Sequence, residues 1–262
     1  MSSISDFKSS PLSLFGVNGG NTTTDASLAT LVGVKFYERA GDRVFALVQN
    51  GGTALVAGNL IQSPASIGAN HTGLTVATAA IGATQVTVTL GATAVTANQY
   101  AGGFLVISAG TGIGQTLEIA SHPAAALSTT VVLTLKDPLS VATLVSDSKG
   151  SLTLPQYGSA NGVDVRTSGV VISPTTATGR IIGATVYPIP ASTSTIPTYG
   201  FIQVRGPVAV LNDSATAIGL DVMPSSSVAG AVVTYVVATR NRVGTSTVAG
   251  ENNKAQLITL QL

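Results

Sequence analysis

Short alternating runs of Thr, Val and Ile, separated by Gly, Pro or Asn, restrict most strongly how this chain can fold. The clearest run is QVTVTL at Gln85–Leu90. Val86, Val88 and Leu90 point to one side of an extended chain and the two threonines to the other, as a strand with one buried face requires. Long segments with Leu, Ala, Glu and Lys at helical spacing are absent. The pattern therefore predicts an all-β protein.

Further strands are expected wherever the same residue types recur between turn signals. The candidates are Val32–Glu38, Arg43–Gln49, Phe104–Ser108, Gln115–Ile119, Thr130–Lys136, Gly169–Ser173, Arg180–Pro188, Gly200–Gly206, Val232–Thr239 and Ala255–Leu262. Many short strands separated by turns favour antiparallel sandwich or barrel-like domains.

Two stretches rich in Ser, Gly, Asn and Pro, Gln62–Gly73 and Asp147–Gly162, are typical of joints between folded units. On this basis we expect an irregular N-terminal arm over residues 1–30 and a β domain over 31–150. A second β domain is expected over 151–262.

The N-terminal arm combines Ser, Gly and Thr with a few large apolar side chains, so it is expected to dock on a surface. Its apolar residues are Phe7, Leu12, Leu14 and Phe15. Either the protein's own domain or a neighbouring subunit or capsid surface can provide the contact. Short helical turns also remain open at Asp25–Thr30 and Ala94–Tyr100.

The charge content is unusually low. Charged residues make up 9% of the chain, against about 25% in ordinary soluble domains. The 12 basic and 11 acidic residues nearly cancel and form no runs, so no basic footprint for nucleic acid is present. A neutral surface suits a protein that is covered by neighbours or exposed to a harsh medium, although an unusually neutral soluble domain fits as well.

The chain contains no Cys, which excludes disulfides and thiolate metal sites. The N-terminal residues lack the basic segment and apolar core of a signal peptide. The apolar run at Ala231–Thr239 is much shorter than the roughly 20 residues of a membrane-spanning helix. No membrane association is therefore expected.

The segment AGTGIGQT, Ala109–Thr116, looks at first like a phosphate-binding loop. A P-loop needs a Lys after its last Gly, but Gln115 follows Gly114 here, and the glycine spacing of a dinucleotide fold also fails. The residues that follow favour a strand rather than a helix, so no helix N-terminus is available for an anion. We therefore expect a hairpin centred near Thr111–Ile113, with Gly112 and Gly114 allowing another backbone to approach at a subunit contact.

No constellation of residues points to catalysis. His71 and His122 are expected at surface or turn positions, and no zinc motif contains them. A Ser-His-Asp triad remains open, but G-x-S-x-G does not occur. Acidic residues are scattered, with Glu38 and Asp42 among the closest pairs, and the lack of Trp disfavours sugar-binding or base-stacking platforms. We expect a protein that is not an enzyme and has no catalytic, cofactor or metal site.

Several segments together resemble virion proteins of tailed bacteriophages. They are GDRVFALVQNGGTALVAGNLIQSP, QYAGGFLVISAGTGIGQTLEIASH, VVLTLKDPLSVA and YVVATRNRVGTSTVAGENNKAQLITLQL. The first three resemble successive elements of such proteins, and the last resembles the closing hairpin of head-decoration proteins. The resemblance covers Val32–Ala142 and, more loosely, Tyr199–Leu262, and it rests on glycine and aliphatic patterns.

The resemblance implies a capsid cement, or decoration, protein that binds the outer surface of the major capsid protein lattice and stabilises the mature head. Such proteins commonly form trimers, are made in the host cytoplasm and reside on the virion exterior. No individual contact residue is carried over, because no residue-specific motif defines the capsid contact. A phage tail or fibre component with a host-binding role is the main alternative, and a cell-surface module is another.

Overall fold

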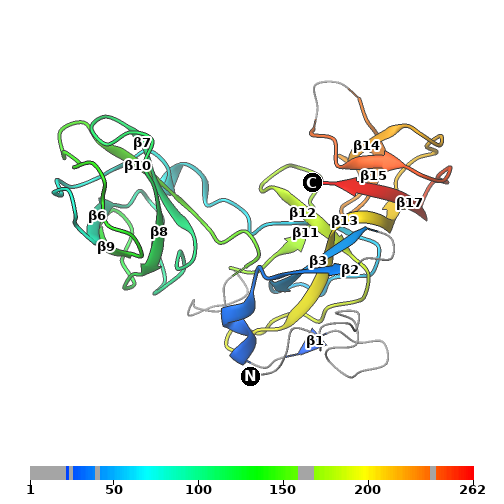
Figure 1. The fold of residues 1–262 in the computed structure, drawn as a ribbon, viewed down its shortest axis with the longest axis horizontal. Coiled ribbons are helices and arrows are strands. Elements are labelled where there is room, and N and C mark those ends of the chain that lie inside the picture. Colours follow the sequence, from blue (N-terminus) through cyan, green and yellow to red (C-terminus); the bar gives the residue numbers. More distant parts are fainter. Residues whose placement is uncertain (1–21, 24–25, 39–41, 159–167, 237–239) are drawn as a thin grey trace.

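The computed structural model describes residues 22–23, 26–38, 42–158, 168–236 and 240–262. Over these residues the chain contains two short 3₁₀ helices, η2 (Ala26–Leu31) and η3 (Gly68–His71), and no α-helix. All its strands belong to two sheets, which form two barrel-like lobes (Figure 1). The predicted all-β, barrel-like fold is thereby confirmed.

The smaller lobe is a six-stranded antiparallel barrel with the strand order β5-β10-β7-β8-β9-β6. Its strands are β5 (Leu74–Thr75), β6 (Gln85–Thr89), β7 (Phe104–Ala109), β8 (Thr116–Ser121), β9 (Thr130–Leu135) and β10 (Lys149–Thr153). A bridge between Val76 and Val88 closes the barrel between β5 and β6. Val86 and Val88 are fully buried, as the alternation in QVTVTL predicted, and each such side chain contributes roughly 1.5–3 kcal/mol of transfer free energy.

The larger lobe is an eleven-stranded sheet organised around one long strand, β13. Its strands are β1 (Thr22–Thr23), β2 (Lys35–Glu38), β3 (Arg43–Gln49), β4 (Leu60–Gln62), β11 (Val171–Ile172), β12 (Ile181–Thr185), β13 (Tyr199–Asn212), β14 (Asp221–Pro224), β15 (Val232–Thr234), β16 (Gly244–Ser246) and β17 (Lys254–Gln261). The first half of β13 pairs with β3 and the second half with β17. Five strands of this sheet form a ring around one of the apolar clusters. Around the ring, each strand pairs with the next in the order β13, β15, β14, β16, β17, and β17 pairs again with β13.

The strand pairing divides the chain differently from the expected boundary at residue 150. Strands β2, β3 and β4 pair with one another or with β11–β13, so this early segment belongs to the same sheet as the C-terminal half. The chain leaves the larger sheet after β4, builds the six-stranded barrel and returns at β11 (Figure 1). The expected joint Asp147–Gly162 contains β10, which completes the smaller barrel through hydrogen bonds to β5 and β7.

Candidate functional site

The glycine-rich segment forms the predicted hairpin. Strands β7 and β8 pair antiparallel, with Phe104 opposite Glu118 and Val106 opposite Thr116, which places the centre of the hairpin at Thr111. The turn is closed by the Gly114 N–H, which donates to the Ile107 carbonyl at 2.9 Å. Because strand β8 follows the glycines directly, this segment has no helix N-terminus to hold a phosphate.

Two glycines of the hairpin allow a loop of the same chain to approach closely. A Cβ on Gly110 would lie 2.2 Å from the Asp147 carbonyl oxygen, and a Cβ on Gly112 would lie 2.9 Å from the Ala142 carbonyl oxygen. Both glycines have positive φ angles, +74° and +85°. The expected close approach at Gly112 therefore exists, but its partner is the protein's own loop 136–148. A Cβ on Gly114 would meet no atom of this chain within 4 Å, and a subunit contact there stays a prediction.

The Gln115 side chain connects loop 136–148 to the base of the hairpin through hydrogen bonds. Its Oε1 accepts hydrogen bonds from the backbone N–H groups of Ser140 and Val141, both at 3.0 Å. Its Nε2 donates to the Val141 carbonyl, also at 3.0 Å. One amide side chain thus satisfies three backbone groups of the neighbouring loop, which fixes the two segments relative to each other.

A third loop, residues 76–84, is bound to the other side of loop 136–148. Ala79 and Thr143 form an antiparallel bridge with hydrogen bonds of 3.2 and 2.9 Å. The Val145 N–H donates to the Thr78 hydroxyl at 3.0 Å. All three loops leave the barrel at the same end, so their hydrogen bonds make that end one connected surface.

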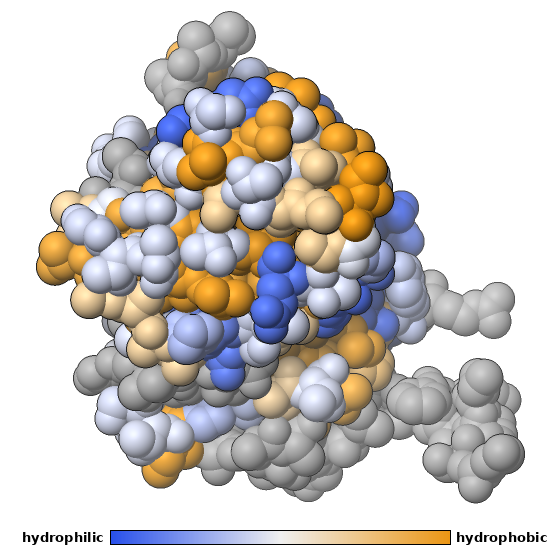
Figure 2. All heavy atoms as spheres, turned by 90° about the vertical axis from the view of Figure 1, so that its left-hand side faces the viewer, coloured by the Kyte–Doolittle hydropathy of each residue, from blue (hydrophilic) through white to orange (hydrophobic). Residues whose placement is uncertain are grey.

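This surface exposes large apolar side chains. We call it the apolar loop end and define it by five residues with exposed fractions of 41–68%: Ile81, Ile113, Val141, Leu144 and Val145. The segments that carry these five side chains include no Asp, Glu, Lys or Arg. They are residues 76–84, 110–115 and 138–146. Figure 2, a view from the side of the smaller lobe, shows hydrophobic side chains gathered in patches with hydrophilic ones scattered between them.

The opposite end of the barrel differs in what it exposes. Loops 90–103 and 122–129 are also uncharged, but Leu127 is the one large apolar side chain that they leave more than a third exposed. Val95 and Tyr100 from these loops are buried. An exposed apolar patch on a fixed backbone is typical of an interaction site, so the apolar loop end is the candidate functional site.

The two histidines lie in turn or loop segments, one of the two positions expected, but they are buried, so the surface position is wrong. His71, His122 and Tyr100 are at most 4% exposed. The Tyr100 backbone N–H donates to His122 Nε2 at 3.0 Å, while His122 Nδ1 lies 2.8 Å from the Pro123 carbonyl. His71 contacts the Tyr100 hydroxyl through Nδ1 and the Thr93 carbonyl through Nε2. Burial is tolerated because the ring nitrogens have hydrogen-bond partners.

This cluster predicts that the stability of the smaller barrel depends on pH. Burial lowers the pKa of His122, and nearby His71 lowers it further, while the hydrogen bond to Pro123 raises it. Burial also raises the pKa of the Tyr100 phenol well above its usual range. As the pH falls below the ordinary histidine pKa of about 6.5, the unfolded chain therefore binds a proton before folded His122 does.

We expect the free energy of unfolding to be at its full value above about pH 6.5 and to fall as the pH drops through that value. Thermal unfolding measured over a series of pH values checks this. The variant His122→Gln keeps an acceptor near the Tyr100 N–H but does not titrate, so its pH dependence should be flatter. An identical pH dependence in the variant and the native protein would contradict the assignment.

Four described acidic residues of the larger lobe take part in ion pairs. Glu38 pairs with Arg43, and Asp42 pairs with Arg205 at 2.9 Å. The expected absence of a metal site stays a prediction. Within the described residues, no three His, Asp or Glu side chains gather as metal ligands.

The apolar arm residues Phe7, Leu12, Leu14 and Phe15 lie outside the described residues. Across the described ranges, no helix has the length and apolar character needed to cross a bilayer. Comparison with known proteins finds no matching family model, no similar curated protein and no similar solved structure.

Proposed function

We propose that this chain is a structural virion protein, a capsid cement that binds the outer surface of a phage major capsid protein lattice and stabilises the mature head. The proposal assigns it no catalytic activity and no cofactor. The observation that carries it is the apolar loop end, five exposed apolar side chains carried by three loops that hydrogen-bond to one another. The segment GGFLVISAGTGIGQTLEIAS, part of the resemblance to phage virion proteins, builds the hairpin in the middle of this surface.

The physical argument rests on preorganisation. A protein that clamps a shell must bind without spending much free energy on ordering its own loops. Gln115 and the Ala79–Thr143 bridge already fix the loops that carry the apolar side chains. Segments 76–84, 110–115 and 138–146 contain no charged residue, so contact through them avoids the cost of desolvating ions.

A homotrimer strengthens such docking. If three copies associate, three apolar loop ends bind neighbouring capsid subunits together, and the effective concentration of the second and third contacts is high. Weak individual contacts then produce stable attachment. We therefore include a trimer in the proposal, with the capsid as the occupant of the apolar loop end.

Sedimentation with phage shells tests the proposal. The purified full chain is mixed with expanded capsids that lack it and with unexpanded procapsids, and each mixture is pelleted. We expect stoichiometric binding to expanded capsids alone, and a trimer mass in light scattering. Failure to bind expanded capsids, together with co-sedimentation with tails or host cells, would replace the cement assignment with that of a tail or fibre component.

A further inference from the structure

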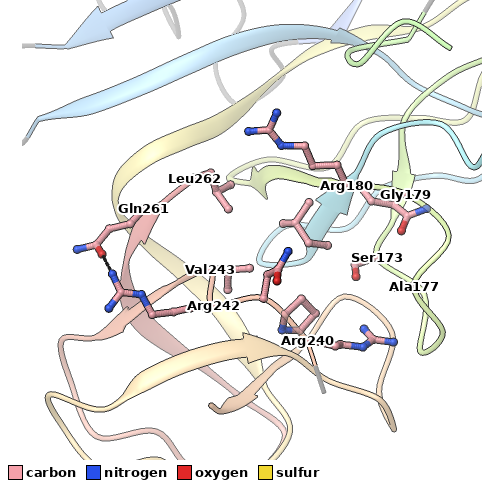
Figure 3. Close-up of a pocket in the computed structure, with 13 residues that line it drawn as sticks. Ser173, Ala177, Gly179, Arg180, Arg240, Arg242, Val243, Gln261 and Leu262 are labelled. Atoms are coloured by element: carbon pink, nitrogen blue, oxygen red, sulfur yellow. Dashed lines mark hydrogen bonds between the residues drawn. The ribbon is translucent and has the colours of Figure 1, made fainter. Parts of the chain in front are cut away.

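The larger lobe contains a cavity at the point where its sheet divides. Strand β13 pairs with β12 at Gln203, opposite Ala184, and pairs with β17 from Arg205 onward, opposite Gln261. The start of β12 and the end of β17 therefore separate. A cavity of about 520 Å³ lies beside this division, lined by Ile181 at the start of β12 and by Leu262 just after β17 (Figure 3).

Three arginines line this cavity. Arg180 lies on the side of β12 and Arg240 and Arg242 on the opposite side, with their guanidinium groups pointing in different directions (Figure 3). A neighbouring cavity of about 300 Å³ shares Arg180 and adds Lys35 and Arg205. The two cavities thus gather five of the chain's 12 Lys and Arg residues, and no Asp or Glu of the described residues is among their lining.

Two of these five cations are neutralised by carboxylates. Arg242 Nη1 lies 3.0 Å from both carboxylate oxygens of Asp221, and this contact holds the pKa of Asp221 below its usual range. Arg205 pairs with Asp42. These pairs are exposed, so they position the two arginines more than they add stability.

The other cations have no carboxylate partner among the described residues. Arg240 donates to the backbone carbonyls of Pro174, Thr175 and Ser225, which fixes its side chain but leaves its charge uncompensated. The exposed Arg180 side chain has no described hydrogen bond or ion pair and lies where the two cavities meet. In a chain with 9% charged residues, this concentration of positive charge marks an anion site.

The rest of the lining indicates what kind of anion fits. Ile181, Pro224, Val243 and Leu262 provide apolar surface between the arginines. A polypeptide with alternating carboxylate and aliphatic side chains matches such a lining, because the planar guanidinium binds carboxylates well and the aliphatic groups bury apolar surface. The smaller cavity is lined by Tyr37 and Tyr157, on which a base can stack, so nucleic acid is the competing ligand. The larger cavity, which gathers three of the five cations, offers no aromatic side chain and favours the polypeptide.

We propose that the two adjoining cavities bind an acidic, partly aliphatic polypeptide segment of another protein, with Arg180 as the principal carboxylate-binding side chain. This inference concerns the larger lobe and does not depend on the docking of the apolar loop end on a capsid. It gives the protein a second interaction surface, one that recognises charge.

Fluorescence anisotropy with the full chain tests the proposal. The probe is a short fluorescent peptide of alternating Glu and Val, with a Gln-for-Glu version as the neutral control. We expect the acidic peptide to bind in low salt and to be released by added salt, and the neutral peptide not to bind. Arg180→Gln should weaken binding about 3- to 10-fold, and Arg180→Glu should abolish it.

Lys254→Gln is the matched control, because it also removes one positive charge from the protein. Lys254 forms an exposed ion pair with Glu251, and neither residue lines either cavity. It should bind the peptide as the native protein does. Equal weakening by Lys254→Gln and Arg180→Gln would overturn the site, because the binding would then follow net charge alone. Equal binding of the neutral peptide, or tighter binding of an oligonucleotide of the same charge, would overturn the acidic polypeptide as the ligand.

Discussion

The variant Gly110→Ala is expected to destabilise the six-stranded barrel by about 3–4 kcal/mol. Its new Cβ would lie 2.2 Å from the carbonyl oxygen of Asp147 and 2.4 Å from the carbonyl carbon, and both are backbone atoms that cannot rotate away. Asp147 is itself held in place, since its carboxylate accepts hydrogen bonds from the Thr111 N–H at 3.1 Å and the Thr111 hydroxyl at 2.9 Å. Relief of the clash therefore requires the hairpin and loop 136–148 to separate.

The variant Gly114→Ala is the control, because it introduces the strain of a positive φ without the clash. Gly114 has a φ of +92° but no atom within 4 Å of the added Cβ, so its variant should lose about 1–2 kcal/mol from the positive φ alone. Amide hydrogen exchange of peptides from β7 to β10 measures both losses within the barrel. Equal losses in the two variants would mean that the contact between the hairpin and loop 136–148 contributes nothing.

Local features of the fold could be predicted from the sequence. The burial of Val86 and Val88 follows from alternation within a single strand, and the hairpin at Thr111 follows from glycines placed between two β runs. Both depend on residues close together in the chain, where the preferences of the backbone and the side chains decide the structure. These expectations are confirmed for that reason.

Features that depend on distant segments could not be predicted. Lys149–Thr153 is rich in small polar residues and resembles a linker, yet it becomes β10 because β5 and β7 offer it free backbone hydrogen-bonding groups. His71 and His122 resemble surface residues until Tyr100 and nearby carbonyls provide partners inside the barrel. The tertiary partners, which local sequence does not reveal, decide both outcomes.

The candidate site was predictable only in part. The sequence indicated that Ile113 lies at the tip of a turn, where a side chain is exposed. Val141, Leu144 and Val145 belong to an apolar stretch that looks like core, and nothing local distinguishes them from the buried Leu139 nearby. Their exposure follows from the way Gln115 and Ala79 fix the loop, which a sequence pattern does not record.

The second large effect concerns the apolar loop end. Ile113→Asp and Val145→Asp should each weaken attachment to expanded capsids about 100-fold or more, because each places an unpaired carboxylate in an apolar contact. Folding should be unaffected, since the two native side chains are 66% and 57% exposed. Binding is measured by titrating each variant against capsids and quantifying the pelleted protein, with circular dichroism and thermal unfolding to confirm the fold.

Ile218→Asp is the matched control for these variants. Ile218 is 68% exposed, almost the same as Ile113, but it lies between β13 and β14 in the larger lobe. If the apolar loop end is the docking surface, Ile218→Asp binds capsids as the native protein does. If Ile218→Asp loses binding while Ile113→Asp retains it, the capsid contact belongs to the larger lobe. A loss of the trimer in Ile113→Asp would assign the apolar loop end to subunit association, because exposed aliphatic groups on a fixed backbone fit a second copy as readily as a capsid.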